Sequence, residues 1–432
     1  TTAIIDYGSL IYIALQRSKT AKEAVKVMTN LVQEYGFKSS GESFTVADPD
    51  EIWILEMIGK GPGIRGAVWV AVRVPDDAIS AHANQARIHK FNMSDKENCL
   101  YAPDVISFAR EKGYFNGINK DFSFANAYAP LDFGARRFCE ARVWSFFNMF
   151  TDKGQEFLPY IQGDTDEPMP LFMKPTKKLS VQDVRDAMRD HYEGTPLDIT
   201  KDFGAGAYNT PYRLSPLSFT YEGEDYFNER PISTQQSAFV FVSQMRSFMP
   251  DPVGGVLWFG LDDANMTILS PVYCSTTEVP HSYARNGADY ITFSWDNAFW
   301  MYNWVANMVY PRYGLMIGDL KKVQREVESY YETNQPGIEK VATDLYAKDP
   351  AMARDFLTQY TKVSAQYAFD SWKKLGEYLI VKYNDGVITK TNADGTFMRN
   401  EIGEPAGVTR PGYSDEFKKE YIKQTGDRYK VK

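Results

Sequence analysis

Polar side chains that could take part in catalysis follow the third of three predicted β-strands. The stretch HANQAR (82–87) comes shortly after the apolar run 67–74. Asn84 and Arg87 can both donate hydrogen bonds, so they could face a substrate at the end of a buried sheet. They could instead cap the strand and satisfy backbone carbonyls, which is the commoner role of an isolated polar residue. His82 could tune such a site or be a structural group.

Two further charged residues interrupt or end apolar strands. Glu56 lies within the apolar run 51–58, and a buried carboxylate needs a partner. It could hold the ammonium group of a peptide, or it could form an ion pair with an arginine. Arg246 follows the run 234–245 and could bind a substrate carboxylate through two hydrogen bonds. A surface position beside the PDPVGG turn is the alternative for Arg246.

The residue types available in this chain restrict the possible chemistry. It contains three cysteines and four histidines, without CxxC or Cys/His zinc spacing, and it lacks a GxSxG elbow, an HExxH helix and a Walker loop. We therefore predict neither a metal site nor a cofactor. Structural roles are expected for Cys99, Cys139 and Cys274, and whether two of them form a disulfide stays open.

Length and composition indicate a large globular protein. The 432 residues suit one large domain with additions, or two to three domains, and 44% of them are hydrophobic. The net charge of −8 argues against nucleic acid as a partner, because phosphate binding needs clustered Lys and Arg. No stretch reaches the roughly 18 consecutive apolar residues of a membrane span.

Periodicity and turn residues divide the chain into four predicted segments. The first, 1–91, has two helices within 6–35 and then strands at 43–47, 51–58 and 67–74. The second, 92–230, is an aromatic, loop-rich insertion with helices at 103–112 and 180–192. The third, 231–295, has strands at 234–245, 255–261 and 266–273. The fourth, 296–432, is predicted to be helical at 296–310, 318–333, 336–347 and 350–384, with a short helix near 416–424. The short turns between strands favour antiparallel sheets.

Longer strings carry a family resemblance. They are YGSLIYIALQRSKTAKEAV (7–25), EYGFKSSGESFTVADPDEIWILEMIGKG (34–61), VWVAVRVPDDAISAHANQARI (68–88), MRDHYEGTPLD (188–198), STQQSAFVFVSQMRSFMPDPVGGVLWFG (233–260) and FSWDNAFWMYNWVAN (293–307). In these strings the chain resembles the bacterial cysteine dipeptidases of the N-terminal-nucleophile (Ntn) hydrolase superfamily.

The resemblance implies a fold and an activity. The fold expected is α+β, a four-layer αββα sandwich of antiparallel sheets with a loop-rich insertion and a helical C-terminal region. The activity expected is dipeptide hydrolysis in a secreted or periplasmic protein, which could be a homo-oligomer, with Asn84 donating to the oxyanion. The alternatives are an acyl-amide hydrolase of the same superfamily and a non-catalytic module that binds peptide or glycan.

The nucleophile of that family is a cysteine at the N-terminus of the mature protein, and the printed chain begins inside the family pattern. We therefore expect the cysteine in a segment that precedes this chain, as part of the same polypeptide or as a separate one. Thr1 is the alternative, since a terminal threonine can use its own amine as the base. However, TTAIIDYGSL leads into a predicted helix, whereas an N-terminal nucleophile should begin a strand.

Overall fold

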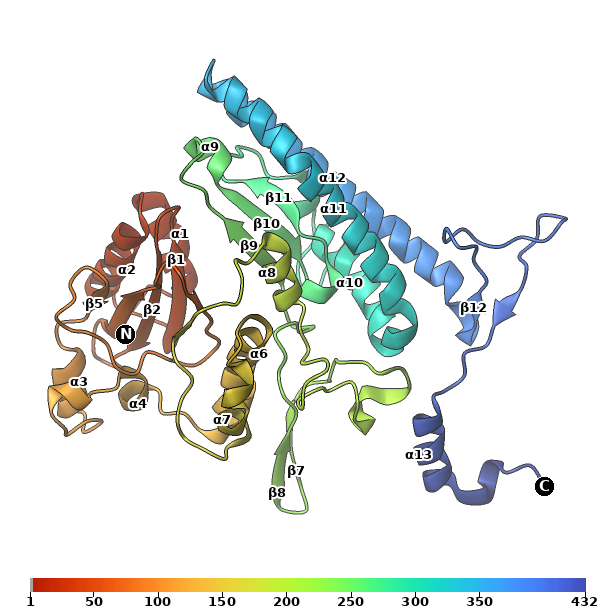
Figure 1. Ribbon diagram of the computed structural model, residues 1–432, viewed down its shortest axis with the longest axis horizontal. Helices are drawn as coiled ribbons and strands as arrows, with labels where there is room; N and C mark the ends of the chain where they lie inside the picture. Colours follow the sequence, from red (N-terminus) through yellow and green to blue (C-terminus); the bar gives the residue numbers. More distant parts are fainter. Residues whose placement is uncertain (1–2) are drawn as a thin grey trace. The chain divides into compact units, whose positions relative to one another are not determined.

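The computed structural model describes residues 3–432 and contains two compact units (Figure 1). The first consists of the chain up to Ser180 together with Glu229–Pro231. The second consists of Val181–Asn228 and Ile232–Lys432. Helices and several antiparallel sheets make up both units, as the α+β prediction requires.

The first unit begins with the two predicted helices, α1 (Tyr7–Arg17) and α2 (Ala21–Tyr35). The Thr20 side chain accepts a hydrogen bond from the Glu23 amide at 3.2 Å and so caps α2, as the sequence predicted. Gly36 ends α2 with φ +73°, a conformation that glycine adopts without steric cost.

A four-stranded antiparallel sheet follows, in the order β1-β2-β3-β5. The predicted meander is confirmed, and its strands are β1 (Gly41–Ala47), β2 (Ile52–Gly59) and β3 (Ala67–Arg73). Strand β5 (Cys99–Tyr101) comes from the predicted insertion and pairs with β3. Trp53, Leu55 and Met57 pack in the core with α1 and α2, and Ile54 packs in a second core on the other face. Because side chains alternate along a strand, Glu56 points into this second core.

Short elements make up the rest of the first unit. Strand β4 (Ile79–Ser80) pairs with β6 (Phe172–Met173). The helices are α3 (Val105–Glu111), α4 (Phe124–Tyr128), α5 (Phe133–Ala135), a π-helical turn (Arg136–Glu140), α6 (Ala141–Phe150) and α7 (Leu158–Gln162). The predicted helix at 103–112 corresponds to α3.

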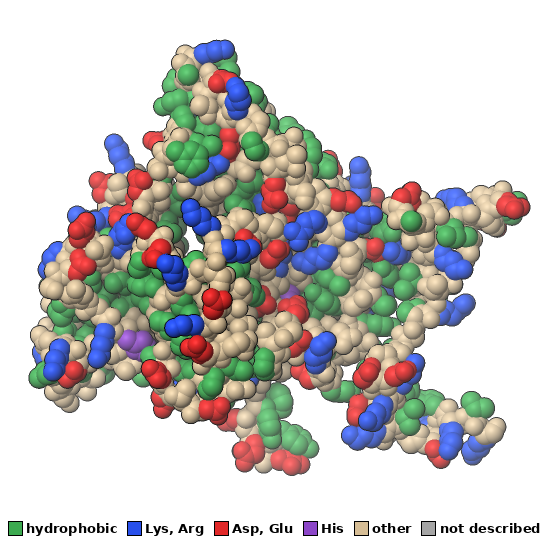
Figure 2. Space-filling view, viewed as in Figure 1, with side chains coloured by type: hydrophobic (Ala, Val, Ile, Leu, Met, Phe, Trp, Pro, Cys, Tyr) green, Lys and Arg blue, Asp and Glu red, His purple; other side chains and the backbone are tan. Residues whose placement is uncertain are grey.

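The second unit has a three-stranded antiparallel sheet in the order β11-β10-β9. Its strands are β9 (Phe239–Gln244), β10 (Val256–Leu261) and β11 (Ser270–Tyr273). The predicted strand at 266–273 is too long, because Ala264–Met266 form a 3-10 turn that ends before the strand begins. A separate hairpin is formed by β7 (Ser218–Tyr221) and β8 (Glu224–Phe227), and Figure 2 shows hydrophobic and acidic side chains together at its tip.

Helices cover one face of this sheet. They are α8 (Val181–Met188), α9 (Asp251–Gly254), α10 (Ala298–Val309), α11 (Tyr313–Tyr346) and α12 (Pro350–Lys382). After α12 the chain forms β12 (Ile388–Thr389), β13 (Val408–Thr409) and α13 (Asp415–Thr425). Val240, Val242 and Trp258 share a core with α10, α11 and α12. The opposite face of β9 exposes Phe239 and Phe241, which are 54% and 48% accessible to solvent.

Two helix predictions need correction. The helix predicted at 180–192 ends at Met188, and Tyr192 turns into the left-handed region at φ +67°. The two helices predicted on either side of Pro336 are one, α11, as Figure 1 shows. Proline inside a helix costs about 3 kcal/mol, but the helix continues because Val327, Tyr331 and Ala342 are all buried along its inner face.

Candidate active site around Asn84

Asn84 is exposed to solvent, but the residues on both sides of it are fixed by hydrogen bonds or burial. The stretch follows β4 in the first unit, and Arg87 and Ile88 are buried, with 3% and 1% of their surface accessible. Ser80 donates from its hydroxyl to the Leu171 carbonyl at 2.8 Å on the β6 side. Asn84 therefore lies on a segment that is fixed at both ends.

Glu56 anchors the far end of this stretch. Its two carboxylate oxygens accept the backbone N–H groups of Arg87 at 2.6 Å and of Ile88 at 3.0 Å. Burial raises the pKa of Glu56 to about 7, and this effect outweighs the two amide hydrogen bonds, which lower the pKa. The partner of this buried carboxylate is thus the backbone of the site stretch, rather than a peptide ammonium group or an arginine side chain.

The Arg87 guanidinium is bound by protein acceptors at all three nitrogens. Nε donates to the two carboxylate oxygens of Glu140 at 2.9 and 3.2 Å, and Nη1 donates to the Ala81 carbonyl at 3.0 Å. Nη2 donates to the carbonyls of Met169 and Pro170 at 3.4 and 3.2 Å. Arg87 therefore pairs with Glu140 and satisfies three backbone carbonyls, which agrees with the structural alternative for this residue rather than with contact to a substrate.

His82 lies on the near side of Asn84. Its Nε2 is 2.7 Å from the Thr45 hydroxyl on β1. Burial, and secondarily the charge of Arg87, lowers the pKa of His82 to about 4. The imidazole is consequently neutral and weakly basic at neutral pH, which suits a positioning contact better than general-base catalysis.

The residue that contacts the Asn84 side chain was not predicted from the sequence. Arg142, at the start of α6, donates from Nη2 to Asn84 Oδ1 at 2.8 Å. The same nitrogen is 3.9 Å from Cys139 Sγ, and Nε donates to the Phe138 carbonyl at 2.7 Å. Spacing places Cys139 and Arg142 on one face of a helix, but only tertiary structure brings Asn84, which lies 58 positions earlier, to that face.

The other predicted site residues lie elsewhere. Arg246 belongs to the second unit, where Nη1 and Nη2 donate to the two carboxylate oxygens of Glu339 at 2.8 and 2.6 Å. Nη2 and Nε also reach the carbonyls of Val253 and Gly254, both at 3.3 Å. Arg246 therefore joins β9 and α9 to α11. Thr1 lies outside the described residues.

All three cysteines are free thiols, so none forms a disulfide. Burial raises the pKa of Cys139 and of Cys274, and it raises that of Cys99 to about 11. Within residues 3–432, no histidine nitrogen is hydrogen-bonded to any of these thiols. The cysteines of this chain thus lack the activated thiolate that a cysteine nucleophile requires.

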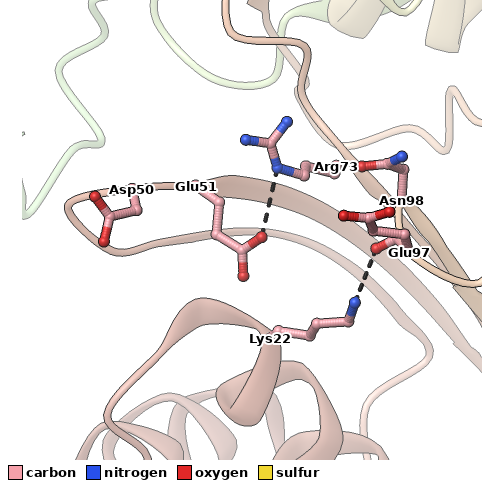
Figure 3. Close-up of a pocket in the computed structure, with 6 residues that line it drawn as sticks. All are labelled: Lys22, Asp50, Glu51, Arg73, Glu97 and Asn98. Carbon is pink, nitrogen blue, oxygen red and sulfur yellow. Dashed lines mark hydrogen bonds and ion pairs between the residues drawn. The ribbon is translucent and has the colours of Figure 1, made fainter.

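A pocket of about 360 Å³ opens beside the turn that joins β1 to β2 (Figure 3). Its lining residues are Lys22, Asp50, Glu51, Arg73, Glu97 and Asn98. Arg73 lies 3.4 Å from Glu51, and Lys22 donates to the Glu97 carbonyl at 2.9 Å, so both cations already have protein partners. None of the predicted site residues lines this pocket. Over residues 3–432, no three His, Cys, Asp or Glu side chains are grouped as metal ligands.

Comparison with known proteins identifies the family. The model of peptidase family C69 matches residues 1–326, which is three quarters of the chain. The chain belongs to peptidase family C69. Proteins similar to the chain are a "Probable dipeptidase" of Salmonella dublin, a "Probable dipeptidase" of Latilactobacillus sakei and "Dipeptidase A" of Lactobacillus helveticus.

These relatives are distant and longer than the chain. The Salmonella protein is 27% identical over 60% of the chain, and the match spans 53% of its own length. The Latilactobacillus protein is 25% identical over 83% of the chain and 68% of its own length, and the Lactobacillus protein is 25% identical over 67% and 54%. The chain thus spans about half to two thirds of the relatives it matches. No helix among the described residues is long and apolar enough to cross a membrane.

Proposed function

We propose that this C69 chain is part of a dipeptidase that cleaves dipeptides through an N-terminal cysteine. The observation that carries the proposal is the family match, together with an exposed asparagine that a buried framework holds in place. A tetrahedral intermediate needs a rigid donor for its oxyanion, and the Asn84 side-chain amide is suited to that role.

The cysteine is proposed to lie in polypeptide that precedes Thr1, as it does in the cysteine dipeptidases that this chain resembles. Its thiolate would attack the peptide carbonyl carbon, and its own α-amine would take the thiol proton and pass it to the leaving amine. Water would then release the acyl group from sulfur. No metal takes part in these steps. The proposal is supported by the raised thiol pKa values of Cys99, Cys139 and Cys274.

The αββα sandwich also belongs to this proposal. Its support is a helical layer on one face of each sheet: α1 and α2 pack on the first sheet, and α10, α11 and α12 pack on the second. The apolar face that carries Phe239 and Phe241 would be an inner face of such a sandwich. A secreted or periplasmic location and a homo-oligomer are proposed on the family resemblance alone, and cell fractionation and light scattering test them.

The test of function is hydrolysis by the full-length protein, with its intact mass and N-terminal residue determined first. We expect amino acids to be released from dipeptides, and little release from tripeptides or acyl amides. Cleavage of acyl amides in preference to dipeptides would favour the amidase alternative. Saturable binding of dipeptides without turnover would instead favour a binding module.

A further inference from the structure

The direction in which the Asn84 amide points is determined by Arg142. An asparagine side chain has one acceptor atom, Oδ1, and one donor group, the Nδ2 amide. Guanidinium nitrogens only donate, so the atom that faces Arg142 Nη2 at 2.8 Å must be Oδ1. The Nδ2 group is then directed away from Arg142, on a residue that is exposed to solvent.

Arg142 is itself held in place. It stands directly after the π-helical turn Arg136–Glu140, a rare irregularity that often occurs at functional sites. Its Nε donates to the Phe138 carbonyl of that turn at 2.7 Å. Glu140 of the same turn binds Arg87, three residues beyond Asn84. One irregular turn therefore fixes both Asn84, through Arg142, and the segment that follows it.

We propose that Arg142 is a positioning residue that turns the Asn84 Nδ2 group toward the reacting carbonyl, an inference that rests on the proposed dipeptidase function. Its fixed positive charge beside Oδ1 polarises the amide, so that Nδ2–H becomes a stronger donor to a developing oxyanion. Without this contact the amide can rotate and present its oxygen, which would repel the oxyanion. Arg142 would thus act on kcat rather than on substrate binding.

The test is a kinetic double-mutant cycle in the full-length protein, with Arg142→Met, Asn84→Ala and the double variant. Arg142→Met keeps an unbranched apolar stem but removes the hydrogen-bond donors. We expect kcat to fall by about 10- to 100-fold with KM within about threefold, and Asn84→Ala to cost about 10²- to 10³-fold, the scale for one oxyanion donor. The double variant should be no slower than Asn84→Ala alone, because Arg142 acts only through Asn84.

A matched control is available in the same unit. Arg110 on α3 donates from Nη2 to Asn119 Oδ1 at 2.6 Å, the same pair of groups on the surface. Arg110→Met should leave kcat unchanged, and Arg142→Lys, which retains a donor, should recover part of the lost rate. The inference is overturned if Arg142→Met has the wild-type kcat, or if the losses of the two single variants multiply in the double variant.

A second readout separates this inference from the proposed function. With ¹⁵N-asparagine labelling, the Asn84 side-chain signals are identified by their absence from Asn84→Ala. They should shift in Arg142→Met and not in Arg110→Met, whether or not the protein is active. Unchanged signals in Arg142→Met overturn the inference. Failure of the wild type to hydrolyse dipeptides, with the signals shifted, overturns the dipeptidase proposal and leaves the orientation of Asn84 supported.

Discussion

Replacing Asp262 by asparagine should stabilise the protein progressively as the pH rises. Asp262 is fully buried at the end of β10, with φ +74°, and its Oδ1 accepts one long hydrogen bond, 3.3 Å, from Asn303. Its Oδ2 has no partner among the described residues. Burial, reinforced by the charge of Asp263, raises the pKa of this carboxyl well above its ordinary value. Asparagine has the same shape and tolerates a left-handed backbone.

The size of the effect follows from proton linkage. The folded pKa lies above the unfolded pKa, so the contribution of Asp262 to stability is complete at low pH and declines as the pH rises toward the folded value. Between the two pKa values the unfolded chain has lost one proton that the folded chain keeps. The free energy of unfolding therefore falls by about 1.4 kcal/mol per pH unit from this group. Asp262→Asn lacks this loss, so its stability advantage over the wild type should grow by about 1.4 kcal/mol for each pH unit between the unfolded and the folded pKa of Asp262.

The assay is urea unfolding of both proteins at pH 5, 6 and 7, fitted with one transition for each compact unit. Neighbouring Asp263 provides the control. Its carboxylate oxygens accept hydrogen bonds from the hydroxyl groups of Tyr212 at 2.5 Å, Ser233 and Tyr310, and from the Asn265 backbone amide. Asp263→Asn places an NH₂ donor against some of these donors, so it should lower the free energy of unfolding by about 2 to 6 kcal/mol. Parallel stability curves for wild type and Asp262→Asn would refute the reasoning, because they would mean that folded Asp262 is already ionised at pH 5.

Three further outcomes are expected. Glu56→Ala leaves the amides of Arg87 and Ile88 without their acceptor, so it should cost about 2 to 6 kcal/mol of unfolding free energy and lower kcat; unchanged stability would show that another group holds these amides. Arg246→Met should lower the free energy of unfolding by about 3 to 5 kcal/mol, because Glu339 loses its buried partner, and should leave KM for dipeptides unchanged. A rise in KM without a loss of stability would indicate instead that Arg246 binds the substrate. His82→Gln should not alter the pH dependence of kcat above pH 5, since the pKa of His82 is already about 4, and a profile that loses a limb near neutrality would contradict this.

Local patterns predicted much of the fold. The capping Thr20, the glycine at the end of α2 and the turn residues between the first three strands each act within a few positions, and the structure confirms them. Elements that depend on distant partners were harder to predict. Strand β5 is three residues long and is a strand because it pairs with β3, and α11 passes through Pro336 because the residues on both sides of it are buried.

The site was predictable only in part for the same reason. Asn84 could be selected because it follows a strand, but its exposure and its hydrogen bond to Arg142 depend on α6, far along the chain. Glu56 was correctly expected to need a partner, yet that partner is the backbone of Arg87 and Ile88, which carries no side-chain signal. Arg87 looked like a substrate ligand because Glu140, which binds it, is 53 residues away.

Active-site labelling of the full-length protein tests the central claim most directly. The protein is treated with iodoacetamide until dipeptide hydrolysis is lost, and the modified residue is identified by peptide mass mapping. We predict that activity is lost on modification of one cysteine at the N-terminus of the mature protein, with protection by a competing dipeptide. The buried Cys99 and Cys139 should remain unmodified, and modification of the exposed Cys274 should leave hydrolysis unchanged. Loss of activity on modification of one of these three cysteines, or full activity with every thiol modified, would contradict the account.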